Sequence, residues 1–332
     1  MIISKSKVMK VQHIIGADLS KTTIDLFLQS RLQIENTKIG FQQMMNWFKQ
    51  QNINASEVMI VMEHTGLYSY CFENFLHEHH IAFCKVNAYA VKRSMGLVRG
   101  KSDSIDARRL ANYGSKEKLS VEPQLSKELQ RLQMLYSTRE RLVRHKAALL
   151  NAVSEYRNIG LAARDLIMTT HTTVIKSFEK QIEKLQNQMD DIVKNNPSIK
   201  GNQNLLQSIK GVGRVLSIAT IIKTRNFTRF QSARKFACFC GTAPFEHTSG
   251  SSIRGKTKVS QLADKTMKTL LDLSAKSAIQ YDKELREYYL RRIESGKSKM
   301  STINIVRNKI LYRMFAVIKR QTPFVENYLQ TA

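Results

Sequence analysis

Four carboxylates in the first third of the chain have positions suited to binding metal ions. Asp18 follows an apolar strand-like run, and Glu63 stands directly after the apolar run 58–62. Asp103 and Asp106 open a helix-like segment, and residues three apart on a helix point the same way, with Cβ atoms roughly 5–6 Å apart. Oxygen-only ligand sets select Mg²⁺ or Mn²⁺. Two such ions about 4 Å apart can activate an attacking oxygen and stabilise a leaving oxygen at a phosphate.

Each acid taken alone also has a structural interpretation. Asp18 fits a turn cap, Asp103 fits a helix N-cap, and Asp106 is favoured by the dipole of the helix that it opens. Together, however, the acids occur on the elements that would bring them to one end of a sheet. A cluster of carboxylates stays ionised only with cations nearby. We therefore predict a catalytic Mg²⁺ or Mn²⁺ site.

A serine in the last third is a second candidate for chemistry. Ser249 lies in the small, polar run 248–252, which the sequence predicts as a loop, and serines in such loops are usually solvated linkers. A serine becomes a nucleophile only where its surroundings favour the alkoxide. The basic residues Arg254, Lys256 and Lys258 follow closely and are candidates both for that role and for binding nucleic acid.

A glycine turn near residue 211 is a candidate phosphate contact. Lys210, Gly211, Gly213 and Arg214 join two helix-like segments, and glycines without side chains let backbone N–H groups approach a phosphate. This resembles a helix-hairpin-helix element. An ordinary packing corner between two helices explains the same pattern, and the local basic residues favour the DNA interpretation.

The charge of the chain points to a polyanionic partner. The formal net charge is +26, from 53 Lys and Arg against 27 Asp and Glu. Residues 200–332 hold 25 of the basic residues and 8 of the acidic ones, so this segment is the main electrostatic footprint. No run approaches the roughly 20 apolar residues of a membrane span, and no signal peptide opens the sequence. We expect a cytoplasmic, nucleoid-associated protein that binds DNA.

The elements that position the acids follow from hydrophobic periodicity. Three strand-like runs come first, and helices then alternate with strands, in the order β-β-β-α-β-α-β-α. The expected strands are 11–18, 22–28, 31–35, 58–62 and 81–86, and the expected helices are 39–50, 67–78 and 103–113. This order predicts an α/β RNase H-like domain over residues 1–119, with a mixed sheet and helices on both faces.

The remainder of the chain is predicted to be mainly helical. Near-heptad apolar residues between 125 and 195 predict a coiled-coil arm over residues 120–199, which we expect to mediate self-association into a homo-oligomer or to clamp nucleic acid. Residues 200–332 form the predicted C-terminal, serine-containing DNA-binding domain. Asn195, Asn196 and Pro197 mark the boundary between these two segments.

The cysteines do not favour a disulfide framework at this chain length. Cysteine and histidine ligands within fourteen residues raise the alternative of a zinc site, at Cys71, His77, His79, His80 and Cys84. The spacing lacks a paired Cys-x-x-Cys knuckle. A helix end followed by a strand that holds Cys84 as a small apolar residue explains it better.

Several stretches, in motif order, resemble the Piv-like DEDD transposases of bacterial insertion sequences. Three of them are similar to the acidic motifs of the family, and four are similar to its second conserved domain. The acidic motifs are residues 16–21, 62–68 and 101–107, and the others are residues 209–213, 230–234, 241–244 and 246–250. The resemblance implies a RuvC-like N-terminal domain and a serine-bearing C-terminal domain that act together on DNA.

The same resemblance implies residue roles and partners. Asp18, Glu63, Asp103 and Asp106 match the acidic tetrad, and Ser249 matches the covalent nucleophile. The family also implies a structured guide RNA that pairs with donor and target DNA. The chain departs from the family at 261–265, where a Lys-Arg-Gly-Asn-like continuation is replaced.

Two other functions remain open from the sequence. A RuvC-like nuclease would use the same metal site to activate water and would form no bond between protein and DNA. A non-catalytic nucleic-acid-binding protein would use the carboxylates only structurally.

Overall fold

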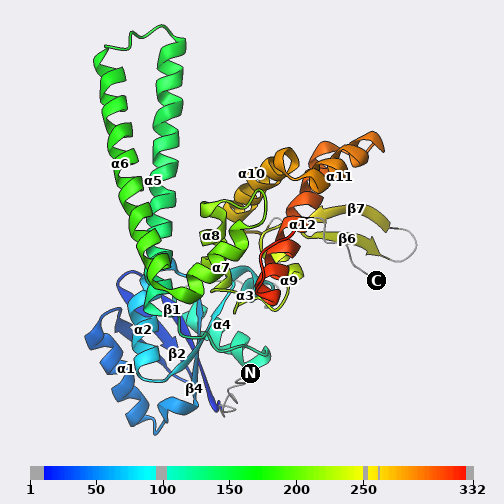
Figure 1. Cartoon of the computed structure of the whole chain (residues 1–332). Helices are drawn as coiled ribbons and strands as arrows, with labels where there is room; N and C mark the ends of the chain where they lie inside the picture. The colour runs from blue at the N-terminus through cyan, green and yellow to red at the C-terminus, as the bar shows by residue number, and fades with distance from the viewer. Residues whose placement is uncertain (1–10, 95–102, 250–252, 261, 327–332) are drawn as a thin grey trace. The chain divides into compact units, whose positions relative to one another are not determined.

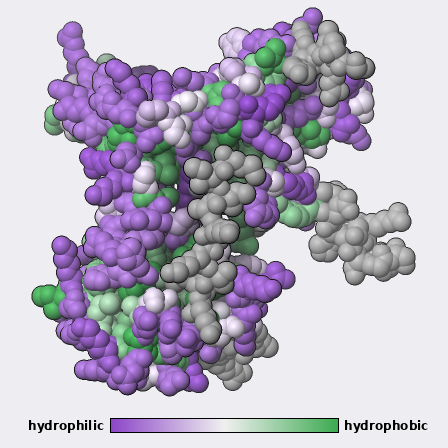
Figure 2. All heavy atoms as spheres, turned by 60° about the horizontal axis from the view of Figure 1, so that its bottom comes forward, coloured by the Kyte–Doolittle hydropathy of each residue, from purple (hydrophilic) through white to green (hydrophobic). Residues whose placement is uncertain are grey.

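The chain forms two compact units. The computed structural model describes residues 11–94, 103–249, 253–260 and 262–326, and the units span Met1–Gln124 and Leu125–Ala332 (Figure 1). In the described residues, no helix is long and apolar enough to cross a membrane. On the face drawn in Figure 2, the surface is mainly hydrophilic, with hydrophobic residues between the polar ones.

The first unit is built on a five-stranded mixed sheet, as the sequence predicts. The strands have the spatial order β3-β2-β1-β4-β5; β1, β4 and β5 are parallel, and β2 runs antiparallel to its neighbours β1 and β3. The strands are β1 (His13–Leu19), β2 (Thr23–Phe27), β3 (Arg31–Glu35), β4 (Val58–Glu63) and β5 (Ala82–Val86). Strand β1 is therefore central, and its carboxyl end lies beside that of β4.

Helices complete the first unit. They are α1 (Lys38–Gln50), α2 (Tyr70–Glu78), α3 (Ala88–Ser94) and α4 (Asp103–Lys116), with short 3-10 turns η1 (Ala55–Glu57) and η2 (Gly66–Ser69). Thr37 caps α1, because its side chain accepts a hydrogen bond from the N–H of Gly40. The predicted helix 67–78 is a 3-10 turn followed by an α-helix that begins at Tyr70.

Alternation along the strands divides the core of this unit into two clusters. Ile15 and Ala17 of β1 pack with Phe41 of α1 in the larger cluster, whereas Val61 of β4 packs with Leu110 of α4 in the smaller one. Successive side chains of a strand point to opposite faces. The even-numbered residues of β1, including Asp18, therefore face α4.

Small residues let α4 lie directly on the sheet. A Cβ atom added at Gly16 would stand 1.9 Å from the backbone oxygen of Ala107, and one added at Gly114 would stand 2.6 Å from Cγ2 of Val61. Neither position tolerates a side chain while α4 stays where it is. This contact fixes the first turns of α4, which carry two of the predicted metal ligands.

The described residues of the second unit are helical apart from one β-hairpin, in agreement with the predicted helical C-terminal region. Its helices are α5 (Lys127–Asn158), α6 (Leu166–Asn195), α7 (Pro197–Gln207), α8 (Arg214–Thr224), α9 (Ala233–Phe239), α10 (Lys265–Tyr281), α11 (Lys283–Glu294) and α12 (Lys299–Arg320). The hairpin consists of β6 (Pro244–Ser249) and β7 (Ile253–Val259). A large apolar cluster, which includes Ile218, Phe236 and Leu311, forms the core.

Helices α5 and α6 form the predicted arm, and they run side by side as an antiparallel pair (Figure 1). At one end of α5, Leu132 joins the core cluster of the second unit. Farther along, Val153, Met168 and Ile175 make a separate small cluster between the two helices. This small cluster joins the two helices away from the base, and the base of the arm shares a core with α7 and α8.

The hairpin replaces a predicted loop. The sequence predicts residues 248–252 as a loop, but Thr248 and Ser249 complete strand β6, which pairs with β7. The physical reason is the alternation of Ile253, Thr257 and Val259 with basic residues, a period-two pattern typical of a strand. The loop interpretation of Ser249 is wrong, because the residue ends a strand.

Candidate active site

The sheet register places two of the predicted acids side by side. Ala17 of β1 pairs with Met62 of the parallel strand β4, so Asp18 and Glu63 are the next residues of adjacent strands. Alternation directs both toward the face that α4 covers. Both side chains are partly exposed. The carboxyl ends of parallel strands are a common place for a functional site.

Asp106 approaches this pair from α4. Burial raises the pKa of the Glu63 carboxyl above its usual range, and the negative charge of the nearby Asp106 raises it further. Asp106 is partly compensated, because Arg109 donates to its Oδ1 at 2.7 Å. The structure thus brings Glu63 and Asp106 within electrostatic range of each other and concentrates negative charge at this edge.

Asp103 is the first residue of α4, one turn before Asp106, and its side chain is outside the described set. Among the side chains that are described, no three His, Cys, Asp or Glu residues lie close enough together to hold a metal ion. The donors at this edge are all carboxylate oxygens, which suit a hard divalent cation. A cation would also offset the repulsion that raises the pKa of Glu63.

A further acid on the same face was missed by the sequence reasoning. Asp25 of β2 stands directly across from Asp18 and is 1% exposed. Its Oδ1 accepts a hydrogen bond from Nε of Arg31 at 2.6 Å, and its Oδ2 accepts one from Nε2 of Gln33 at 3.0 Å. The signal was present, because Asp25 interrupts the otherwise apolar run of Ile24 and Leu26 in a predicted strand.

Ser249 and the basic candidates lie on the hairpin of the second unit. Ser249 is the last residue of β6 and pairs with Ile253 of β7, while Thr248 pairs with Arg254. Lys256 and Lys258 follow at alternate positions of β7, and Lys258 is exposed. The backbone therefore places the serine and the nearest basic residue at the same end of a two-stranded ribbon.

The root of the hairpin is held by α12, which sequence reasoning also missed. The backbone oxygen of Thr242, two residues before β6, accepts hydrogen bonds from Nδ2 of Asn304 and of Asn308, each at 2.8 Å. Thr242 is fully buried. Gly241 next to it has a φ of +65°, and a Cβ there would stand 2.4 Å from Cβ of Ala263. These contacts fix where β6 leaves the core.

The segment 261–265, where the chain departs from the family pattern, has a structural role. Asp264 caps α10 by accepting a hydrogen bond from the N–H of Met267 at 2.9 Å, and it pairs with Lys223 of α8 at 2.7 Å. Its own N–H donates to the backbone oxygen of Phe239. Asp264 therefore attaches the segment that follows β7 to the core.

The predicted glycine turn joins α7 to α8. Gly211 has a φ of +86°, and a Cβ there would stand 2.6 Å from the backbone oxygen of Ser274, so this glycine is needed for packing on α10. Gly213 faces open space and precedes α8. Lys210 is paired with Glu326 at 2.6 Å. The turn is thus a packing corner on one side and open on the other.

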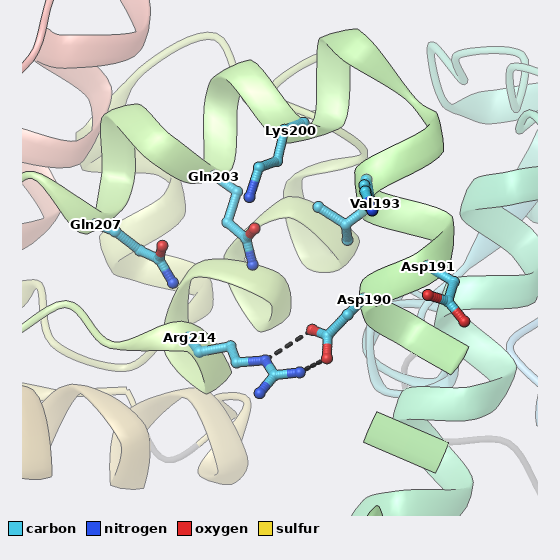
Figure 3. Close-up of a pocket in the computed structure, with 8 residues that line it drawn as sticks. Asp190, Asp191, Val193, Lys200, Gln203, Gln207 and Arg214 are labelled. Atoms are coloured by element: carbon cyan, nitrogen blue, oxygen red, sulfur yellow. Dashed lines mark hydrogen bonds and ion pairs between the residues drawn. The ribbon is translucent and has the colours of Figure 1, made fainter. Parts of the chain in front are cut away.

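Arg214 lines a pocket of about 270 Å³ between α6, α7 and the start of α8 (Figure 3). Its guanidinium forms an ion pair with Asp190, and Nε donates to Oδ1 of that residue at 2.7 Å. Lys200 and Gln203 of α7 also point toward the pocket. A DNA contact by Arg214 would therefore share the guanidinium with a carboxylate.

Two of the cysteines, Cys84 and Cys240, are poor ligands and poor nucleophiles. Burial, and secondarily the charge of Glu122, raises the pKa of the Cys84 thiol to about 11. Burial also raises the pKa of Cys240. Cys84 lies inside strand β5, whereas Cys71 is exposed on α2. A zinc site would require the thiolate that this burial disfavours.

Comparison with known proteins gives matches to both units. Residues 203–290 match the Transposase IS116/IS110/IS902 family, and residues 15–156 match a DEDD transposase family of the IS110 type. The pilin gene-inverting proteins of Moraxella bovis and Moraxella lacunata are each 26% identical over 320 residues, which cover 93% of this chain and 97% of theirs. A probable family 20 transposase of Pseudomonas aeruginosa is 23% identical over 252 residues, or 67% of this chain and 73% of its own.

These matches, with acids gathered on a mixed sheet and a helical second unit, define an enzyme of the DNA transposase and recombinase class. The chain belongs to the DEDD transposases of the IS110 type. This result excludes the non-catalytic binding protein that the sequence left open.

Proposed function

We propose that the chain is an insertion-sequence transposase that cuts and rejoins DNA with a metal-binding acidic tetrad and a serine nucleophile. The first unit is interpreted as an RNase H-like domain, and the tetrad is Asp18, Glu63, Asp103 and Asp106. One observation carries the proposal: Asp18 and Glu63 lie at the carboxyl ends of adjacent parallel strands, and the charge of Asp106 on α4 adds to the burial that raises the pKa of Glu63.

The tetrad suits phosphate chemistry because it combines fixed backbones with excess negative charge. The close contact of α4 with Gly16 holds Asp106 over the strand ends, so little reorganisation is needed when a cation arrives. Mg²⁺ or Mn²⁺, when bound, would polarise a backbone phosphate and stabilise the departing oxygen. Arg109, paired with Asp106, keeps that carboxylate oriented.

Ser249 is the proposed nucleophile for strand cleavage. Its Oγ forms a bond to the phosphorus of a DNA backbone phosphate, and one phosphorus–oxygen bond of the backbone breaks. The serine proton leaves to a base or to water, and the departing sugar oxygen takes up a proton. The phosphoserine retains the bond energy that a later joining step uses. Position at the end of a basic hairpin supports this role.

The proposed partners are DNA and a structured guide RNA. The excess of basic residues in 200–332 supports DNA binding there, with Lys210, Gly211, Gly213, Arg214, Arg254, Lys256 and Lys258 as candidate contacts. The guide RNA rests on the family resemblance alone. We further propose that the protein acts on the bacterial nucleoid as a homo-oligomer, with the exposed residues Ile159 and Leu166 near the end of the arm available for association.

A strand-exchange assay with purified protein, its DNA and Mg²⁺ tests the tetrad. Asp106→Asn and Glu63→Gln should each lower recombination by more than the 10–100-fold typical of outer-shell changes at metal sites, because each removes a ligand charge at nearly constant volume. Glu78→Gln is the matched control, since Glu78 is exposed at the end of α2. Full activity of Asp106→Asn and Glu63→Gln would contradict the tetrad.

A further inference from the structure

The face of the sheet beneath α4 carries two arginines beside the carboxylates. Two neighbouring rows of cross-strand partners describe it. In one row Asp18 of β1 stands across from Asp25 of β2; in the other Gly16 stands across from Phe27. The second row continues to Arg31 of β3, which pairs with Phe27. All these residues share one face, because they occupy alternate positions of their strands.

Arg31 is held by the buried carboxylate. Nε and Nη2 of Arg31 lie 2.6 and 2.5 Å from Oδ1 of Asp25, whose side chain is 2% exposed. The Arg31 side chain is 48% exposed. The guanidinium is planar, with five N–H groups in a fixed fork, so one edge engages Asp25 while the Nη1 side points away from it. A buried ion pair adds little to the free energy of unfolding, but the pair with Asp25 fixes the orientation of the Arg31 guanidinium.

Arg108 reaches the same face from α4. Its Cζ lies 5.6 Å from the centroid of the Phe27 ring, in cation–π geometry, and its side chain is exposed. The neighbouring Arg109 turns to Asp106 instead. Arg31 and Arg108 therefore flank Phe27, one row away from Asp18, and each is oriented by a residue of β2. Arg31 is held by the buried Asp25, and Arg108 stacks on the half-buried Phe27.

We propose that this arginine ledge, formed by Arg31 and Arg108, binds a backbone phosphate of the DNA strand that the carboxylates act on. The inference rests on the proposed function of the carboxylates. Metal ions on the tetrad would bind the reacting phosphate, and a second phosphate of the same strand must then lie on a neighbouring surface. A guanidinium suits that phosphate because its N–H fork matches two phosphate oxygens.

The ledge contributes position rather than sequence preference. Phosphate contacts set the register of a strand and carry no base information. An acidic cluster repels a polyanion, and two oriented arginines at its border offset that repulsion where the strand enters. The basic excess of residues 200–332 lies in the other unit, whereas the ledge is positive charge that the first unit itself holds beside the carboxylates.

The test uses the full chain, a duplex DNA that it cleaves, and binding isotherms at several salt concentrations. Arg108→Ala removes one phosphate contact without exposing a buried charge, so it should weaken binding by about tenfold and lower the salt slope by about 0.9. Arg31→Lys keeps a charge beside Asp25 but loses the fork, so it should raise the DNA concentration for half-maximal cleavage more than it lowers the maximal rate.

Lys49→Ala is the control, because Lys49 is exposed on α1, which packs in the other core cluster of the sheet. Arg108→Ala and Arg31→Lys are then compared with Lys49→Ala in the salt slope of binding and in the DNA concentration for half-maximal cleavage. If neither quantity differs, the proposed role of the arginine ledge is wrong. Asp106→Asn is measured in parallel to separate failure of the ledge from failure of the proposed function. If Asp106→Asn loses cleavage, the acidic tetrad is retained. If Asp106→Asn cleaves fully, the acidic tetrad is rejected. If the arginine variants weaken only the binding of a structured RNA of equal length, the assignment to DNA is overturned.

Discussion

The carboxylate edge of the first unit and the serine hairpin of the second are positioned by different physical means. Asp18, Glu63 and Asp106 stand on three elements that share a packed core, so their backbones are fixed by register and by the contact at Gly16. Ser249 stands on a two-stranded ribbon, which alone is marginally stable, and the ribbon is attached at its root through Thr242. Substitutions that disturb core packing should therefore displace the carboxylates, whereas substitutions that remove specific polar contacts should displace the hairpin and Ser249.

Gly16→Ala should produce the largest change, on the side of the carboxylates. The new Cβ would lie 1.9 Å from the oxygen of Ala107, so α4 must move away from β1. We expect the first unit to lose about 3 kcal/mol and recombination to be lost with it. Chemical unfolding followed by Trp47 fluorescence reports on this unit, because Trp47 is the only tryptophan of the chain.

The control for that change is Gly201→Ala in α7, where a Cβ meets open space. This substitution should stabilise the second unit by about 0.5–1 kcal/mol through helix propensity. If Gly16→Ala and Gly201→Ala both change the free energy of unfolding by a similar small amount, the close approach of α4 to β1 does not position the carboxylates.

Removing both asparagine contacts at the hairpin root should be the next largest effect. Asn304→Ala with Asn308→Ala leaves the buried Thr242 oxygen without its two donors, which costs about 1–3 kcal/mol. Recombination should fall severalfold while DNA affinity changes little, because the backbone path to Ser249 is loosened and the charge is intact. Met300→Ala, an exposed change in the same helix, is the control. Unchanged recombination in the double variant would show that the root does not position the serine.

Glu63→Gln should have the smallest effect on stability, and its sign is informative. The pKa of Glu63 is raised in the folded state, so the parent loses stability as pH rises from the ordinary carboxyl range through the raised value. The glutamine of Glu63→Gln does not ionise, so the variant does not lose this stability as the pH rises. Without divalent cations at neutral pH, the variant should melt about 1–2 °C higher than the parent, a small shift because solvent screens a half-buried group.

The melting difference for Glu63→Gln should disappear below the ordinary carboxyl pKa and shrink when Mg²⁺ is added. Glu78→Gln should show neither dependence. A variant that melts lower than the parent at neutral pH without Mg²⁺ would mean that Glu63 is stabilising rather than held in a repulsive site, and the carboxylate edge would then be an ordinary structural cluster.

The sequence was sufficient for the first unit because its signals are local. Apolar alternation located the first three strands, short apolar segments located the strands at 58–62 and 81–86, and the position of Glu63 after a buried run indicated the edge of the sheet. The close contacts of Gly16 with Ala107 of α4 and of Gly114 in α4 with Val61 of β4 were not predictable, since they join residues more than fifty positions apart. The burial of Asp25 was missed for a different reason: a polar residue between Ile24 and Leu26 fits a strand with one solvent-facing side equally well.

The second unit was less predictable because its functional segment depends on distant partners. Residues 248–252 were predicted as a loop because the run is small and polar, and Gly255 interrupts the period-two pattern of 253–259 that follows it. The attachment of Thr242 to Asn304 and Asn308 joins positions more than sixty residues apart. The arm was recognised from its near-heptad pattern, but its shared core with α7 and α8 required the tertiary structure.

The most direct test of the account is a denaturing gel of the protein incubated with end-labelled DNA and Mg²⁺. We predict a covalent protein–DNA adduct in the parent, none in Ser249→Ala, and none in Asp106→Asn, because the serine and the metal-binding edge act on the same phosphate. Ser251→Ala and Ser252→Ala should retain the adduct. An undiminished adduct in Ser249→Ala, or recombination that proceeds with no adduct at all, would contradict the serine mechanism and favour metal-activated water as the nucleophile.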